Sequence, residues 1–324
     1  MTTAEILDAF RRLRILVVGD VCLDRWCRYD PSLADPSRET GIPRTAVVDT
    51  EVTPGAAGTV ANNLAALGAG QVDVMGIAGD DGFGYELERA LAARGISAAH
   101  LLRAPSLPTF TYTKLLNCVT GEEDLPRIDF VNTRPIPAEI EKQLVQRFEQ
   151  AASGYDVILV SDQAETEQGG VVTGAMRDAI GRAVAADPSA LVWVDSRMRA
   201  EHFRGVIVKP NAEEAEAASR RALGRVDFAA LRRHIAAPLL IVTHGGEGAE
   251  VVADSGVRWV PGRRVEKPVD ICGAGDSFSA GAALTLAVTH DPVTAAEFGN
   301  RVASITIMKK GTGTASPEEI LGGC

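Results

Sequence analysis

The feature that most constrains the fold is the alternation of short apolar runs with helical stretches along most of the 324 residues. The runs are rich in β-branched residues and lack polar alternation, which is typical of strands buried on both faces. They cover 14–20, 72–79, 156–162, 191–196, 205–211, 239–245 and 250–256. The helical stretches cover 58–68, 82–95, 137–153, 170–186, 212–223, 227–236, 274–289 and 293–310. This order predicts an α/β fold with a mostly parallel central sheet between two helical layers.

Two segments interrupt this alternation. Residues 25–54 are rich in Pro, Asp, Arg and Thr, and residues 107–133 read as an antiparallel hairpin that turns at Thr120-Gly121. Together they could form a small β-sheet that covers the strand ends of the core as a lid, or they could be a surface decoration without function. No repeat or linker divides the chain, so we expect one domain over 1–324.

Composition excludes several classes of protein. The formal net charge is −10 and no basic stripe is present, which argues against a nucleic-acid partner. The five cysteines are widely spaced and form no C-x-x-C pair, as expected in a reducing compartment. No signal peptide and no run of roughly 18 apolar residues is found. We therefore expect a soluble, cytoplasmic protein without a membrane contact.

The stretch "DICGAGDSF" (270–278) carries the strongest chemical signal. A helix that opens at Gly273-Ala274-Gly275 presents unpaired amides and the positive end of its dipole, an arrangement that suits phosphate. Asp276 stands in the same first turn. It could take the proton of a substrate hydroxyl while the amides stabilise a transferring phosphoryl group. The alternative is that Asp276 only balances the helix dipole.

The sequence that follows supports the catalytic interpretation. "AGAALTLAV" (280–288) is almost entirely small and apolar, so this helix should be buried with its first turn pointing into the molecule. Asn300 lies on the next predicted helix, and the loop 309–317 is rich in glycine and small residues. We expect this loop to lie against an adenine ring.

At this point the pattern resembles a known family. D-x-x-G-A-G-D-x-F is similar to a signature of the ribokinase-like, or PfkB, carbohydrate kinases. Five further motifs follow that family's order: "GDVCLD" (19–24), "PGAAGTVANNLAALGA" (54–69), "GDDGFG" (79–84), "KPNAEE" (209–214) and "VTHGGEG" (242–248). The resemblance covers nearly the whole chain and implies a ribokinase-like three-layer α/β/α core with a β-sheet lid.

Within the family, the chain looks most like the kinase half of D-glycero-D-manno-heptose-7-phosphate kinases. The stretches that carry this closer likeness are "GDVCLDRW", "SRETGIP", "TYTKLLN…RIDF" and "GTGTASPEE". That half is often fused to a nucleotidyltransferase; since this sequence ends at Cys324, we expect no such second domain.

The resemblance also implies roles for individual residues. Asp276 would be the base, and the amides of Gly273, Ala274 and Gly275 would form the anion hole. The acceptor sugar would be bound by Asp24, Gly55 and Thr59. From their places in the two lid segments, Arg38, Lys114 and Arg127 could bind a sugar phosphate, or they could be ordinary solvated charges. ATP would lie near Asn211, Thr243, Gly245, Gly248, Asn300 and Gly311. Asn211 and Glu214 would orient Mg²⁺, although a helix cap would explain this pair equally well. The lid strands would join two copies as a homodimer.

The chain also departs from the family pattern. Ala56 replaces the second glycine of a Gly-Gly pair, Thr59 replaces an asparagine, and "DQAETEQGG" (162–170) replaces the usual charged loop. These changes concern the acceptor rather than Asp276. The alternatives are therefore a kinase for another small sugar, sugar phosphate or nucleoside, or a non-catalytic relative that binds sugar or nucleotide. No G-x-G-x-x-G fingerprint follows the first strand and no G-x-x-x-x-G-K-[ST] motif occurs, which disfavours a dinucleotide oxidoreductase and a P-loop enzyme.

Overall fold

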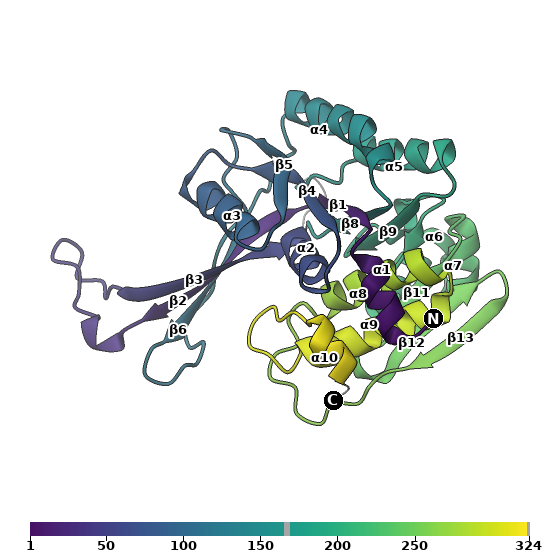
Figure 1. Ribbon diagram of the computed structural model, residues 1–324. Coiled ribbons are helices and arrows are strands. Elements are labelled where there is room, and N and C mark those ends of the chain that lie inside the picture. Colours follow the sequence, from purple (N-terminus) through teal and green to yellow (C-terminus); the bar gives the residue numbers. More distant parts are fainter. Residues whose placement is uncertain (165–168, 323–324) are drawn as a thin grey trace.

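The computed structural model describes residues 1–164 and 169–322, and its core is a nine-stranded sheet (Figure 1). The strand order is β13-β12-β11-β10-β9-β8-β1-β4-β5. The strands are β1 (Arg14–Gly19), β4 (Gln71–Ala78), β5 (Ser97–Arg103), β8 (Val157–Asp162), β9 (Leu191–Ser196), β10 (Ile207–Val208), β11 (Leu240–Thr243), β12 (Gly248–Ala253) and β13 (Gly256–Pro261). Neighbouring strands from β5 to β11 pair in parallel, whereas β12 pairs antiparallel with both β11 and β13 at one edge of the sheet.

Helices cover both faces of this sheet, as the continuous apolar runs predict. Along β1, Ile15 and Val17 belong to one buried cluster, whereas Leu16 and Val18 belong to the other. The first cluster packs against α1 (Thr3–Phe10), α2 (Ala57–Ala66), α3 (Gly82–Ala92), α8 (Ala274–Thr289), α9 (Pro292–Thr306) and α10 (Pro317–Gly322). The second packs against α4 (Ala138–Ala151), α5 (Gly174–Ala186), α6 (Ala212–Leu223) and α7 (Phe228–His234). The three-layer architecture is therefore confirmed.

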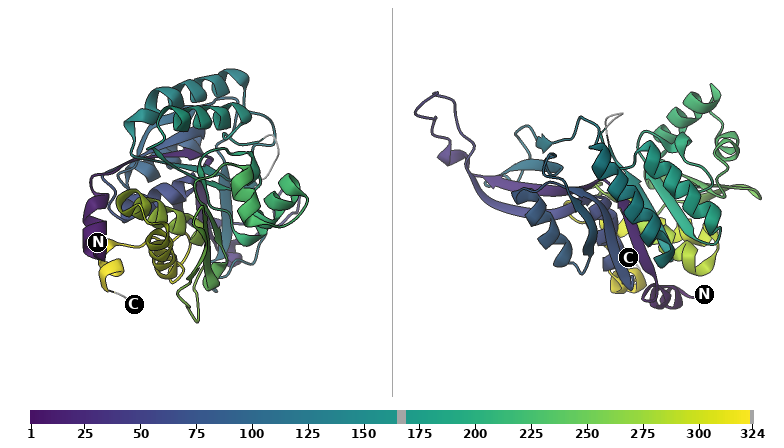
Figure 2. Two further views of the ribbon diagram at one scale, coloured as in Figure 1. Left: turned by 90° about the vertical axis from the view of Figure 1, so that its right-hand side faces the viewer. Right: turned by 90° about the horizontal axis from the view of Figure 1, so that it is seen from above.

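A separate four-stranded sheet contains both interrupting segments. Its order is β3-β2-β6-β7, with β2 (Val21–Tyr29), β3 (Val47–Ala56), β6 (Thr111–Asn117) and β7 (Ile128–Phe130). β6 and β7 pair antiparallel, so the predicted hairpin is confirmed. We call this unit the small sheet. It extends outward from the core, and the connection between β2 and β3 forms its far end (Figures 1 and 2).

Some elements were not anticipated from the sequence. β5, β13 and α1 lie outside the predicted ranges, and the strand predicted at 250–256 proved antiparallel to β11. The reason is the short connection at 244–247, which joins β11 to β12 and leaves no room for a crossover helix. Among the described residues, no helix is long and apolar enough to cross a membrane.

Candidate active site

The first cavity lies between the small sheet and the carboxyl ends of the core strands, with a volume of about 320 Å³. Its walls include six of the residues predicted from the sequence, together with Cys272. The predicted residues are Asp24, Thr59, Lys114, Arg127, Gly273 and Asp276. Strands β2 and β6 pair in parallel with Asp24 opposite Tyr112 and Trp26 opposite Lys114, so all four side chains share the face toward the cavity. Residues from distant parts of the chain thus meet in one place.

The turn before α8 forms part of this wall. Gly273 has φ +76, a left-handed conformation that favours glycine, and α8 begins at the next residue. A Cβ at Gly273 would lie 3.2 Å from the Cγ2 of Thr59, so the start of α2 packs closely against the turn. Asp276 follows in the first turn of α8, and residues 277–286 behind it are buried. The predicted buried helix with an inward-facing start is confirmed.

The amides of this turn are only partly available. The Gly273 and Gly275 N–H groups donate to no acceptor among the described residues, whereas the Ala274 N–H donates to the carbonyl of Ile271 at 3.2 Å. The predicted three-amide hole is therefore wrong for Ala274 in this structure. The tight left-handed turn at Gly273 brings the Ile271 carbonyl under the helix start, which leaves two free amides for an anion.

Asp276 is electrostatically unusual. Its carboxylate makes no hydrogen bond to another described residue. Burial and the nearby negative charge of Asp195 raise its pKa from 3.8 to about 7, while Lys209 opposes the rise. A carboxylate with a pKa near neutrality is well matched to general-base chemistry.

Asp24 sits opposite, on β2. Burial raises its pKa to about 6, while the Cys22 thiol, which donates to its Oδ1, and the charges of Lys114 and Arg127 act in the other direction. A Cβ at Gly55 would lie 2.3 Å from the Asp24 Oδ1, so glycine is needed at that position for Asp24 to occupy its place. Gly55 thus shapes the first cavity through Asp24.

A second cavity of about 290 Å³ lies on the other side of the same turn. It is lined by Ala274 and Gly275 from the turn, by Thr243 and Gly245 after β11, and by Asn300 on α9. Phe278, Ala303 and Ile307 make part of its wall apolar, as a planar ring would require. Residues 273–276 therefore face two cavities at once: Gly273 and Asp276 line the first, and Ala274 and Gly275 line the second.

Six predicted residues line neither cavity. Gly55 contacts Asp24, Asn211 and Glu214 stand at the start of α6, and the other three are Arg38, Gly248 and Gly311. Arg38 is exposed in the connection between β2 and β3, where the Pro36–Pro43 bridge folds the chain back beyond the end of the sheet. Gly248 starts β12, and a Cβ there would meet the Val260 carbonyl at 2.2 Å, so its glycine serves strand packing. Gly311 packs against Trp26 beside the first cavity. That its loop lies against an adenine ring stays a prediction.

Asn211 and Glu214 form the capping box of α6. The Glu214 amide donates to the Asn211 Oδ1, and the Asn211 amide donates to the Glu214 Oε2. Burial and the charge of Asp195 raise the pKa of Glu214. No cluster of three or more acidic, His or Cys side chains suited to a metal occurs among the described residues. A single carboxylate that retains one free oxygen still fits Mg²⁺, which keeps most of its water ligands.

Sequence reasoning missed a buried ion pair beneath the turn. The Lys209 Nζ lies 2.9 Å from the Asp195 Oδ2, and Lys209 is only 3% exposed. Burial lowers the pKa of Lys209, but the adjoining Asp195 outweighs it and the net shift is upward, so the ammonium stays charged. A Cβ at Gly275 would lie 3.7 Å from this Nζ. The signal was present in the sequence, because a charged residue that ends a buried strand, as in "VWVDS" and "VIVKPN", is unusual.

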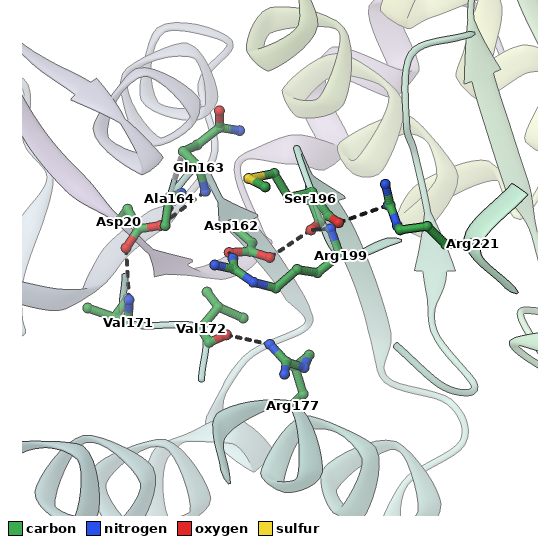
Figure 3. A network of polar contacts seen from close by, with 11 residues as sticks. Asp20, Asp162, Gln163, Ala164, Val171, Val172, Arg177, Ser196, Arg199 and Arg221 are labelled. Carbon is green, nitrogen blue, oxygen red and sulfur yellow. Dashed lines mark hydrogen bonds and ion pairs between the residues drawn. The ribbon is translucent and has the colours of Figure 1, made fainter. Parts of the chain in front are cut away.

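A second missed group lies at the ends of β1, β8 and β9 (Figure 3). The buried Asp20 accepts hydrogen bonds from the amides of Gln163, Ala164 and Val171, and so holds both sides of the loop after β8. Gln163 lines the first cavity. Residues 165–168 of the divergent 162–170 loop lie outside the described residues.

Comparison with known proteins identifies the family. The model for the pfkB family of carbohydrate kinases matches residues 13–319. The chain belongs to this family. The family is one of carbohydrate kinases, which are phosphotransferases.

Relatives agree with this assignment. The chain is 33% identical to the bifunctional protein HldE of Methylococcus capsulatus over 327 residues and 30% identical to that of Pelobacter propionicus over 325 residues. These matches cover 97% and 98% of the chain but only 64% of each relative.

Solved structures share the fold. Phosphofructokinase-2 of Escherichia coli, solved in complex with potassium, matches with a TM-score of 0.71 and 20% identity over 96% of this chain and 97% of that one. Ribokinase of Thermotoga maritima matches with a TM-score of 0.69 and 21% identity over 96% and 98%. An E. coli putative ribokinase II in complex with ATP and Mg²⁺ gives 0.67 and 19% over 96% and 98%.

Proposed function

We propose that this PfkB kinase transfers the γ-phosphoryl group of ATP to a hydroxyl of a sugar phosphate, with D-glycero-D-manno-heptose 7-phosphate, phosphorylated at C1, as the acceptor. One observation carries the proposal: the turn at residues 273–276 separates two cavities and presents a carboxylate to one and a free amide to the other. In-line phosphoryl transfer needs an acceptor and a nucleotide on opposite sides of one such point.

The chemistry follows from these positions. Asp276 accepts the proton of the acceptor hydroxyl while the hydroxyl oxygen attacks the γ-phosphorus of ATP. The bond between the γ-phosphorus and the bridging oxygen of the β-phosphate breaks, and ADP leaves. The Gly273 and Gly275 amides, together with the ammonium of Lys209, stabilise the charge on the phosphoryl oxygens. Asn211 and Glu214 would hold hydrated Mg²⁺, which supplies further charge neutralisation. The second cavity takes the nucleotide, with its apolar wall against the base.

The charges of the first cavity support an anionic acceptor. Its lining includes three basic side chains, Lys114, Arg127 and Arg197, and two acidic ones, Asp24 and Asp276. The Arg127 guanidinium stacks on the Tyr112 ring, 4.7 Å from its centroid, and is bonded to Asp129, which fixes its plane. A planar, fixed guanidinium suits bidentate contact with a phosphate. Asp24 would bind sugar hydroxyls. The sequence resemblance to heptose-7-phosphate kinases and the matches to HldE proteins support the choice of sugar.

Two structural roles of the small sheet belong to the same proposal. It acts as the lid of a single kinase domain, because its cavity face supplies Asp24, Trp26, Tyr112 and Lys114. It also joins two copies into a homodimer. Apolar side chains exposed on its strands support this, among them Val47 and Val48 on β3 and Ile128 and Phe130 on β7.

A screen of ATP consumption tests the function. Wild type and Asp276→Asn are compared on heptose 7-phosphate, mannose 6-phosphate, fructose 6-phosphate and the free sugars, with the product identified by ³¹P NMR. We expect turnover of heptose 7-phosphate and a loss of about 10²- to 10⁴-fold in the variant. Asp8→Asn, an exposed carboxylate on α1, is the matched control and should behave as wild type.

Other results would revise the proposal. Turnover of free hexoses alone would remove the sugar phosphate and keep the kinase. Equal rates for wild type and Asp276→Asn would remove Asp276 as the base. ATP and sugar binding without turnover by wild type would favour a non-catalytic relative.

A further inference from the structure

One side chain of the small sheet makes a contact that substrate binding alone does not explain. Trp26 lies on the cavity face of β2, and its ring packs against the backbone of Gly311, in the loop after α9. A Cβ at position 311 would lie 3.1 Å from the Trp26 Cζ2 and 3.5 Å from its Cε2. Gly311 also has φ +67. Both the space and the backbone conformation therefore require glycine at this contact.

The same loop is bonded to the turn that carries the free amides. The Gly311 N–H donates to the Asp270 Oδ2 at 3.1 Å, and the Cys272 N–H donates to the Asp270 Oδ1 at 2.9 Å. One carboxylate thus joins the loop to the residue that precedes Gly273. A direct contact runs beside it, because a Cβ at Gly273 would lie 3.4 Å from the Cγ2 of Thr312.

The loop also faces the acceptor. Thr312 lines the first cavity, and its Oγ1 is buried without a hydrogen-bond partner among the described residues. A buried hydroxyl without a partner is costly, so an acceptor hydroxyl or phosphate oxygen at this point would be favourable. An acceptor in the first cavity would therefore contact both the small sheet and the loop at their junction.

We propose that Trp26 is a positioning residue that couples acceptor binding to the anion hole through Gly311 and Asp270. When the small sheet closes on the acceptor, the Trp26 ring holds the loop, and Asp270 holds the turn so that the Gly273 and Gly275 amides point at the nucleotide. The two ligands then strengthen each other's binding, and the coupling must be reciprocal. The inference rests on the proposed function, because it needs the acceptor in the first cavity and the nucleotide in the second.

Binding of the non-hydrolysable analogue AMP-PNP with Mg²⁺ tests the coupling. Its dissociation constant is measured by calorimetry on the full chain, with and without a saturating acceptor. The acceptor is heptose 7-phosphate, or the sugar phosphate that wild type turns over fastest in the screen. We expect the acceptor to tighten analogue binding by about 5-fold or more in wild type. In Trp26→Ala we expect this factor to fall to about one, while analogue affinity without acceptor stays unchanged. Trp26→Phe, which keeps a flat ring, should keep most of the factor.

Each other outcome overturns the inference. If the acceptor leaves analogue affinity unchanged in wild type, no coupling exists. If the acceptor tightens analogue binding in Trp26→Ala as much as in wild type, the coupling does not pass through this ring. If Trp26→Ala no longer binds the acceptor, the same measurement is made on Gly311→Ala, because the added Cβ would displace the Trp26 ring from the loop. If the acceptor still tightens analogue binding in Gly311→Ala as it does in wild type, the proposal is refuted. The turnover screen stays independent, because an active kinase with uncoupled ligands contradicts only this inference, whereas an inactive wild type contradicts the proposed function.

Discussion

The charge state of one residue, Asp276, should set the pH dependence of the reaction. Its raised pKa of about 7 means that the carboxyl is half-protonated near neutrality, and only the carboxylate can accept the acceptor proton. We expect kcat/KM to rise about tenfold per pH unit below pH 7 and to level off above it. The profile should be measured at constant ionic strength with a buffer-independent assay. A rate that is flat from pH 5 to 8 would remove Asp276 from the proton transfer.

Ala56 shows what a departure from the family pattern costs. It has φ 52 and ψ −119, a conformation that strains any residue with a Cβ, and it stands where the family has its second glycine. Ala56→Gly should therefore raise the free energy of unfolding by about 1 kcal/mol, the strain relieved less the added chain entropy of glycine. Urea titration at pH 8 measures it.

The control for this prediction is another alanine in the same region. Ala61 is fully buried in the middle of α2 with ordinary helical geometry, so Ala61→Gly should lower stability by roughly 1 kcal/mol or more. If both substitutions destabilise the protein equally, the Ala56 backbone is not strained.

At the scale of elements, the strand ends determine the electrostatics of the site. Asp195 is the penultimate residue of β9 and Lys209 directly follows β10, and the pair lies beneath the turn before α8. Lys209→Met should lower kcat by about 10²- to 10³-fold, because a fixed charge near the transferring phosphoryl is lost. It should also shift the acidic limb of the pH profile upward, because Lys209 opposes the rise in the pKa of Asp276.

The shift of the pH profile separates two roles for Lys209. If the lysine only supports packing, the rate falls while the limb stays at the wild-type pH. A melting curve of Lys209→Met accompanies the kinetics, since Asp195 loses its buried partner in this variant. An unshifted limb in a stably folded variant contradicts the electrostatic role.

The elements also show what the sequence could predict. β1, β8 and β9 were located almost to the residue, because strands buried on both faces are continuous apolar runs. β13 was missed because it is an exposed edge strand, with Val257 and Trp259 facing solvent, and lacks that signal. Likewise, the motifs located Asp24 and Asp276. No local pattern could show that Gly311 would meet Trp26, because that contact depends on how the small sheet sits against the core.

At the scale of the whole molecule, the two sheets have different surroundings. The nine-stranded sheet is covered on both faces by helices, whereas the small sheet projects from the core (Figure 2). Its edge strand β3 carries exposed apolar side chains. Unpaired edges and apolar surface of this kind favour association with another chain. We therefore expect a homodimer through the small sheets, with twice the chain mass of 34.2 kDa.

One substitution on β3 tests the dimer and its link to catalysis. Val48→Asp places a charge on a side chain that is 54% exposed, so the chain should still fold but separate into monomers in light scattering. Val257→Asp, at a similarly exposed position on the edge strand β13, is the matched control and should remain dimeric. If the small sheets stabilise each other, monomeric Val48→Asp should also show a raised KM for the acceptor, because Asp24 and Lys114 lie on strands of that sheet. A dimeric Val48→Asp, or a monomeric wild type, would show that two copies do not meet at this surface.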